Sequence, residues 1–232
     1  MYYLDSSYII FMVPAFLVMA AANWWVNSTY KRWGQTRNSV GMNGQDAAQR
    51  LLAHARLPGV EVAAAQGCLG DHYDPRSRRL HLSPEVAGVP SVASLAITAH
   101  EIGHAMQDRD GYAPLRLRSA LVPAASVGSW LGWILIFIGL VLGFFELAVV
   151  GLVVFAVGAV FALATLPVEF NASARARQLL TDAGLLYTEE ERRGVSSVLN
   201  AAAFTYVAAL IVAVLNVLRF AFMIGGLGRR RD

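Results

Sequence analysis

The sequence contains few charged residues. They make up 15% of its 232 residues, whereas about 25% is usual for a soluble domain. The formal net charge is only +3, which is too small to indicate a nucleic-acid partner. A hydrophobic content of 56% and a mean hydropathy of +0.48 are instead typical of a modest domain joined to a few membrane spans.

Cysteine is also scarce, because Cys68 is the only one in the chain. This excludes an intramolecular disulfide and a zinc site built from cysteines. No basic residues precede the first apolar run. That run is therefore predicted to be a membrane anchor rather than a cleaved signal peptide.

Long apolar stretches are what the sequence does contain. The first, residues 7–26, carries no charge and includes two tryptophans near its end, which favour a membrane interface. Residues 121–166 contain one charge, Glu146, and are predicted to form a hairpin of two spans of about 20 residues each. The fourth stretch, residues 199–218, is predicted to be either a further span or an interfacial helix.

Basic residues indicate how these spans are oriented. They are concentrated in residues 27–120 and 167–198, and none lies at the tip of the hairpin. The positive-inside rule therefore predicts that both segments are cytoplasmic. The three arginines at 229–231 disagree with this rule if the fourth stretch crosses the membrane, so both alternatives for that stretch stay open.

The longest polar segment combines helix and strand signals. Apolar residues recur at helical spacing in residues 45–56. Residues 79–82 alternate as a strand does, after a turn predicted at 74–77. Ser91 is placed to cap a helix that runs from residue 92 to about residue 108. The segment is thus predicted to be a small α+β unit.

A metal-binding motif, His-Glu-Ile-Gly-His, occupies residues 100–104 of this last helix. Because residues four apart share a helix face, His100 and His104 can bind one Zn²⁺. Glu101 lies on the adjacent face, where it can act as general base and acid for a zinc-activated water. Burying these three side chains among small apolar residues is costly without such a purpose.

A catalytic zinc needs a third protein ligand and an open position. The extended pattern with a glycine three residues and a histidine six residues after the second motif histidine is absent, because Gln107 and Asp110 occupy those two positions. A two-span hairpin returns the chain to the membrane side that it left, and Glu169 follows this hairpin at the predicted start of a helix. Glu169 is therefore the predicted third ligand, with Asp110 and His72 as the next candidates. The alternative is that Glu169 only stabilises a helix N-terminus.

The motif, the hairpin and the glutamate after it resemble those of the heat-shock membrane proteases and the CAAX prenyl endopeptidases. Most of the chain is more similar to the YugP-like neutral zinc metallopeptidases of bacteria. The similarity is carried by residues 71–83, 91–107, 166–176 and 201–210. It implies zinc, a bacterial membrane location and Glu169 as third ligand. Ser173 stands where related gluzincins have an aspartate that orients a zinc-bound histidine.

His72 is a further candidate for catalysis. In proteases of this type an edge strand pairs with extended substrate, and a histidine or tyrosine donor holds the oxyanion. The alternative for His72 is a hydrogen bond within its own turn.

Together these features predict a mainly α, integral membrane protein with three to four transmembrane helices and a small α+β, zincin-like cytoplasmic catalytic domain. The expected function is that of a plasma-membrane zinc metalloendopeptidase acting on proteins or peptides. A zinc hydrolase of a lipid-linked amide and a non-catalytic membrane scaffold are the alternatives, and the intact Glu101 argues against the scaffold. The predicted segments are an N-terminal transmembrane helix (1–26), the catalytic domain (27–120), the transmembrane hairpin (121–166), cytoplasmic helices (167–198) and a C-terminal transmembrane or interfacial helix with a basic tail (199–232).

Overall fold

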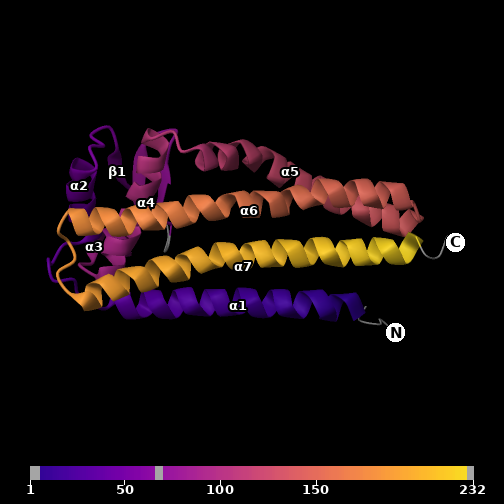
Figure 1. The fold of residues 1–232 in the computed structure, drawn as a ribbon, viewed down its shortest axis with the longest axis horizontal. Coiled ribbons are helices and arrows are strands. Elements are labelled where there is room, and N and C mark those ends of the chain that lie inside the picture. Colours follow the sequence, from indigo (N-terminus) through magenta and orange to yellow (C-terminus); the bar gives the residue numbers. More distant parts are fainter. Residues whose placement is uncertain (1–5, 66–69, 229–232) are drawn as a thin grey trace. The chain divides into compact units, whose positions relative to one another are not determined.

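The computed structural model of the protein describes residues 6–65 and 70–228. Cys68 and the basic tail at 229–231 lie outside the described residues. Figure 1 shows the elements along the chain. They are α1 (Ser6–Gly34), α2 (Gly44–His54), β1 (Glu61–Ala64), β2 (His72–Asp74), β3 (Arg79–Leu82), α3 (Pro84–Gly88), α4 (Val92–Arg109), α5 (Ala113–Leu142), α6 (Phe145–Asp182) and α7 (Glu189–Gly228).

Among the described residues, four helices are long and apolar enough to cross a membrane, namely α1, α5, α6 and α7. One small sheet of three strands accompanies them. The predicted fold class, a mainly α membrane protein with a small α+β part, is thereby confirmed. The fourth apolar stretch is part of α7, which continues unbroken for 40 residues.

The chain divides into two compact units. One consists of Met1–Asn23, Arg116–Leu166 and Thr205–Asp232, and the other of Trp24–Leu115 and Pro167–Phe204. In the first unit α5 and α6 meet at Gly143, whose φ of 73° makes the tight turn between them. A small cluster of buried residues, Ile136, Ala148, Phe220 and Ile224, forms its core.

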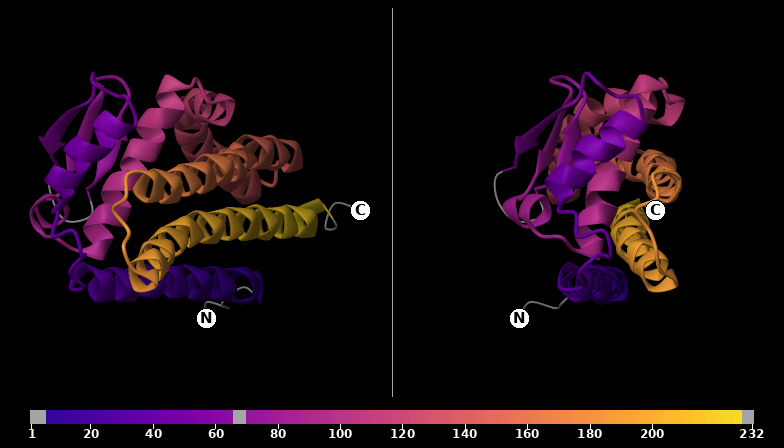
Figure 2. Two further views of the ribbon diagram at one scale, coloured as in Figure 1. Left: turned by 60° about the vertical axis from the view of Figure 1, so that its left-hand side comes forward. Right: turned by 90° about the vertical axis from the view of Figure 1, so that its left-hand side faces the viewer.

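The second unit contains the sheet and the motif helix. The strand order is β1-β3-β2, with β1 parallel and β2 antiparallel to β3. Leu80 and Leu82 of the central strand are buried, as the alternation predicts. α2 packs against α3 and α4, and Figure 2 shows it beside the sheet. The side chains of Leu51, Leu95 and Leu199 join the two leucines in one core.

Local capping explains where the helices of this unit begin. The Ser91 hydroxyl accepts a hydrogen bond from the backbone N–H of Ser94 at 3.0 Å, which confirms the predicted start of α4. Ser83 caps α3 in the same way, with Pro84 in its first turn. At the start of α7, Thr188 and Glu191 bond each other's backbone N–H groups in a capping box.

The prediction that a new helix starts near Glu169 is wrong. α6 runs continuously from Phe145 to Asp182, with Pro167 inside it. A proline removes one intrahelical hydrogen bond, but its fixed φ suits a helix. The buried side chains of Val168 and Ala172 hold the turns that follow in place. Glu169 therefore lies inside a long helix, and stabilisation of a helix N-terminus does not explain it.

Candidate metal centre

The site is built where α4 and α6 approach each other closely. A Cβ atom added to Gly103 would lie 2.6 Å from the backbone oxygen of Ala172, so only glycine allows this approach. Ile102 of the same turn is fully buried and anchors α4 in the core. The glycine of the motif is thus what brings its histidines to the face of α6 that carries Glu169.

Three side chains converge at this crossing. Nε2 of His100 lies 3.3 Å, and Nε2 of His104 3.5 Å, from Oε2 of Glu169. The three potential ligand atoms all lie within 4.8 Å of one another. Ligand atoms about 2.0–2.1 Å from a tetrahedral zinc are about 3.3–3.4 Å apart. Glu169 is only 2% exposed. A buried carboxylate that faces two imidazole nitrogens at this spacing fits a zinc ion.

The outer nitrogen of each histidine also has a partner. Nδ1 of His104 lies 3.0 Å from Oε1 of Gln107. The Gln107 amide nitrogen donates to the backbone oxygen of Val168 at 2.8 Å, which identifies Oε1 as the acceptor end. His104 therefore carries its hydrogen on Nδ1 and leaves the Nε2 lone pair for a metal. Nδ1 of His100 lies 3.3 Å from the hydroxyl of Ser173, the residue that stands in place of the aspartate of related gluzincins.

A polar chain continues from Gln107 to the surface. Oδ1 of Asn171 accepts hydrogen bonds from the Gln107 amide at 3.0 Å and from Nε of Arg175 at 2.9 Å. Arg175 in turn forms an ion pair with Asp110. Hydrogen bonds from Arg109 and Arg175 hold the pKa of the Asp110 carboxyl below its usual range. Asp110, considered above as a ligand, thus supports Arg175 and does not join the metal group of the described residues.

Glu101 lies next to the histidines and is half-buried. Burial raises the pKa of its carboxyl group, although the charges of His100 and His104 act in the opposite direction. Its Oε2 accepts a hydrogen bond from the backbone N–H of Tyr73 at 3.0 Å. Burial alone lowers the pKa of His104, but the hydrogen bond to Glu169 and nearby negative charges outweigh it and raise that pKa.

Strand β2 borders the site through Tyr73. Among the described residues β2 pairs with β3 alone, and the Tyr73 N–H points from the other edge of β2 toward Glu101. The Tyr73 hydroxyl donates to Asp108 of α4 at 2.9 Å. His72 is exposed, stacks on His81 with ring centroids 4.5 Å apart and contacts the backbone oxygen of Gly70. Its catalytic role stays a prediction.

Sequence reasoning missed Gln107 and Tyr73 as parts of the site. Gln107 follows His104 by three residues, which places the two on one face of the helix. This spacing therefore indicates that Gln107 can contact His104. The contact of Tyr73 with Glu101 joins two distant segments through the sheet, and no local pattern indicates it.

The fold and this constellation together define the class of membrane zinc peptidases. Residues 8–225 match the family described as "Putative neutral zinc metallopeptidase", and the chain belongs to this family. It is 38% identical over 215 residues to the "Putative membrane protease YugP" of Bacillus subtilis (strain 168), which covers 90% of this chain and 95% of that protein. No solved structure matches the chain. The resemblance found in the motifs is thus confirmed, and zinc is the cofactor of this family.

Proposed function

We propose that the protein is a gluzincin-type zinc endopeptidase of the plasma membrane, in which His100, His104 and Glu169 bind the metal and Glu101 is the catalytic base and acid. The observation that carries this proposal is the convergence of two Nε2 atoms and one buried carboxylate oxygen. Membership in a peptidase family favours a peptide bond as the target.

Zinc, when bound, supplies Lewis acidity that acidifies water and polarises a carbonyl oxygen. Glu101 takes a proton from the attacking water on its carboxylate and later delivers it to the leaving amine. Burial raises the pKa of the Glu101 carboxyl group, and the charges of His100 and His104 oppose this shift. These opposing effects suit a group that must first accept and then release a proton.

The outer edge of β2 is the natural place for an extended substrate. It faces Glu101 through the Tyr73 N–H. A peptide that pairs with this edge gains main-chain hydrogen bonds and lies alongside the motif helix. Substrate is then expected to take over the Tyr73 N–H, which frees Glu101 for proton transfer.

The catalytic segments are proposed to face the cytoplasm. Lys31 and Arg32 lie at the end of α1, and Arg116 and Arg118 lie in the first turns of α5. The turn between α5 and α6 is followed by Glu146 and has no basic residue. This distribution favours the positively charged ends on the cytoplasmic side.

Purified zinc-loaded protein should cleave an unfolded, fluorescently labelled casein. Glu101→Gln is expected to keep its zinc and to lose at least about 100-fold in rate. Glu61→Gln is the matched control, since this carboxylate is exposed and pairs only with the surface residue Arg79 among the described residues. Near-normal cleavage by Glu101→Gln would refute the mechanism. Release of fatty acid from an acyl-amide lipid without casein cleavage would favour the lipid-linked alternative.

A further inference from the structure

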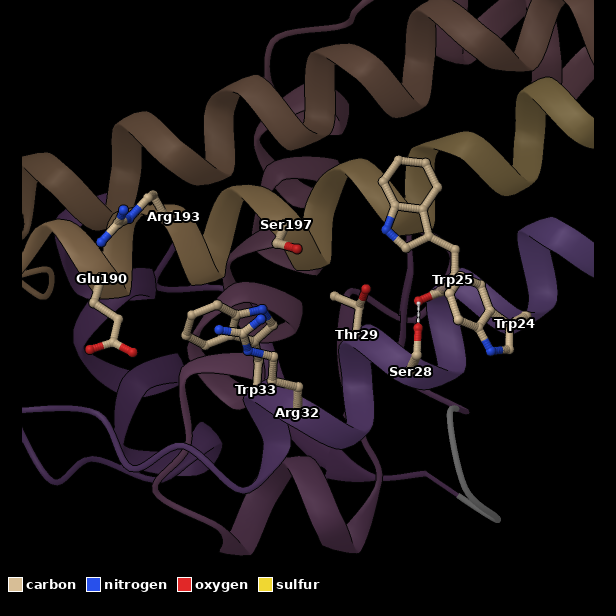
Figure 3. A pocket seen from close by; sticks show the side chains of 9 residues that line it. All are labelled: Trp24, Trp25, Ser28, Thr29, Arg32, Trp33, Glu190, Arg193 and Ser197. Atoms are coloured by element: carbon tan, nitrogen blue, oxygen red, sulfur yellow. Dashed lines mark hydrogen bonds between the residues drawn. The ribbon is translucent and has the colours of Figure 1, made fainter.

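A second pocket lies away from the metal group, within the unit of Trp24–Leu115 and Pro167–Phe204. It has a volume of about 590 Å³, which is within the usual range for small-molecule sites. Figure 3 shows its side chains along the facing parts of α1 and α7. They are Trp24, Trp25, Ser28, Thr29, Arg32, Trp33, Glu190, Arg193 and Ser197.

Close packing of the two helices builds the pocket. At one end the rings of Trp25 and Phe204 are 5.3 Å apart. At the other, a Cβ added to Gly194 would lie 2.6 Å from the ring of Trp33, so glycine is needed for this indole to fit. Trp33 is only 6% exposed. Its buried ring forms a fixed wall, and the two helix segments run antiparallel beside the pocket.

Two arginines give the pocket an excess of positive charge. Arg32 and Arg193 form no ion pair with a carboxylate among the described residues, and the guanidinium of Arg32 lies 5.0 Å from the centre of the Trp33 ring. By contrast, Arg192 pairs with Glu189 at 3.3 Å. Glu190 is the single acid in the lining. One anion would therefore neutralise the site.

The polarity of the pocket changes along the helices. On α1 the charge-free stretch ends at Val26, after which polar and basic residues follow. Trp24 and Trp25 thus lie on the apolar side of the pocket, and the arginines lie on its polar side. Trp24 is 73% exposed, although a large indole prefers an apolar or interfacial partner. Serine and threonine hydroxyls lie between the two ends.

We propose that this pocket binds the head group of an anionic glycerophospholipid. The phosphate lies against Arg32 and Arg193, which offer charge-assisted hydrogen bonds. The acyl chains leave past Trp24 and Trp25 into the bilayer. An anionic lipid is favoured over a zwitterionic one because the lining carries net positive charge, and over free phosphate because three tryptophans give the lining an apolar end. The site lies outside the catalytic machinery and does not depend on the proposed peptidase activity.

The test is native mass spectrometry of the full-length protein released from a neutral detergent, titrated separately with dioleoyl phosphatidylglycerol, phosphatidylethanolamine, phosphatidylcholine and soluble glycerol 3-phosphate. Wild type is compared with Arg32→Gln/Arg193→Gln. The matched control is Lys31→Gln/Arg192→Gln, which removes two charges at the adjacent positions. Size-exclusion chromatography verifies that every variant stays folded and monodisperse.

Wild type and control should retain phosphatidylglycerol with similar affinity, and the pocket variant should bind it at least tenfold more weakly, since hydrogen bonds to charged groups are lost. Glu190→Gln should bind at least as tightly as wild type. Equal binding by wild type and pocket variant would overturn the proposal. An equal loss of phosphatidylglycerol binding in both double variants would overturn the pocket as the site and indicate only non-specific charge attraction. Equally tight binding of glycerol 3-phosphate would identify a phosphate site instead, and a preference for the zwitterionic lipids would contradict the charge argument.

Discussion

Gln107 lies one helical turn after His104 in α4, and its Oε1 is 3.0 Å from Nδ1 of His104. The same amide donates to Val168 and Asn171 of α6. Gln107 is completely buried, so its hydrogen bonds have no competing water. One side chain therefore fixes the tautomer of His104 and fastens the motif helix to the helix that carries Glu169.

Replacing Gln107 should weaken zinc binding without removing a ligand. Gln107→Leu keeps the volume but leaves His104 free to rotate, and we expect zinc affinity to fall about 10- to 100-fold. Competition with a chromogenic chelator measures this. Gln107→Glu retains an acceptor for Nδ1 of His104, so its zinc affinity should fall less than that of Gln107→Leu. Unchanged affinity in the leucine variant would show that His104 needs no support.

Gly103→Ala should separate the two helices of the site. The added methyl group would meet the Ala172 backbone at 2.6 Å, and overpacking of this kind costs about 1–3 kcal/mol. We expect a lower thermal midpoint together with reduced zinc content. Gly59→Ala is the control, because a Cβ there meets no atom within 4 Å. Equal behaviour of the two variants would contradict the close approach.

The ion pair of Asp110 should make a small, pH-dependent contribution to stability. Its pKa is lowered in the folded protein, so the stabilisation is fully present above the unfolded value of about 3.9 and disappears as pH falls through the folded pKa. Because the side chain is 37% exposed, the effect should be below about 1 kcal/mol. Asp110→Asn should melt slightly below wild type at pH 7, and the difference should vanish in acid. A difference that does not change with pH would refute this explanation.

The cytoplasmic orientation can be tested with a single cysteine. Arg76 is exposed in the turn between β2 and β3, and Arg76→Cys in a Cys68→Ser background provides a reporter. It should resist a membrane-impermeant maleimide in intact cells and react after the cells are opened. Ready labelling of intact cells would invert the proposed topology.

Local signals accounted for much of the fold. The cap at Ser91 and the alternation in β3 depend on neighbouring residues, and each prediction agrees with the structure. The predicted helix start near Glu169 is wrong because the span and the following helix are one element, and α6 stays continuous through Pro167, where Val168 and Ala172 are buried.

The candidate site also contains residues that local patterns predict and residues that depend on tertiary packing. His100 and His104 follow from spacing within one helix, whereas Glu169 is predicted from the return of the chain after the hairpin and from the resemblance to known families. The hydrogen bonds of Gln107 to α6 depend on how the two helices pack, which the spacing within α4 alone does not predict. The approach of Tyr73 to Glu101 depends on sheet packing, which no short pattern encodes.

The zinc content of Glu169→Gln tests the central claim most directly. Wild type and the control Asp182→Asn, an exposed carboxylate on the same helix, should each carry about one zinc per chain by mass spectrometry of the metal. Glu169→Gln should lose most of its zinc and its peptidase activity, while circular dichroism and gel filtration remain those of the folded protein. Full zinc occupancy in Glu169→Gln would contradict the proposed ligand set.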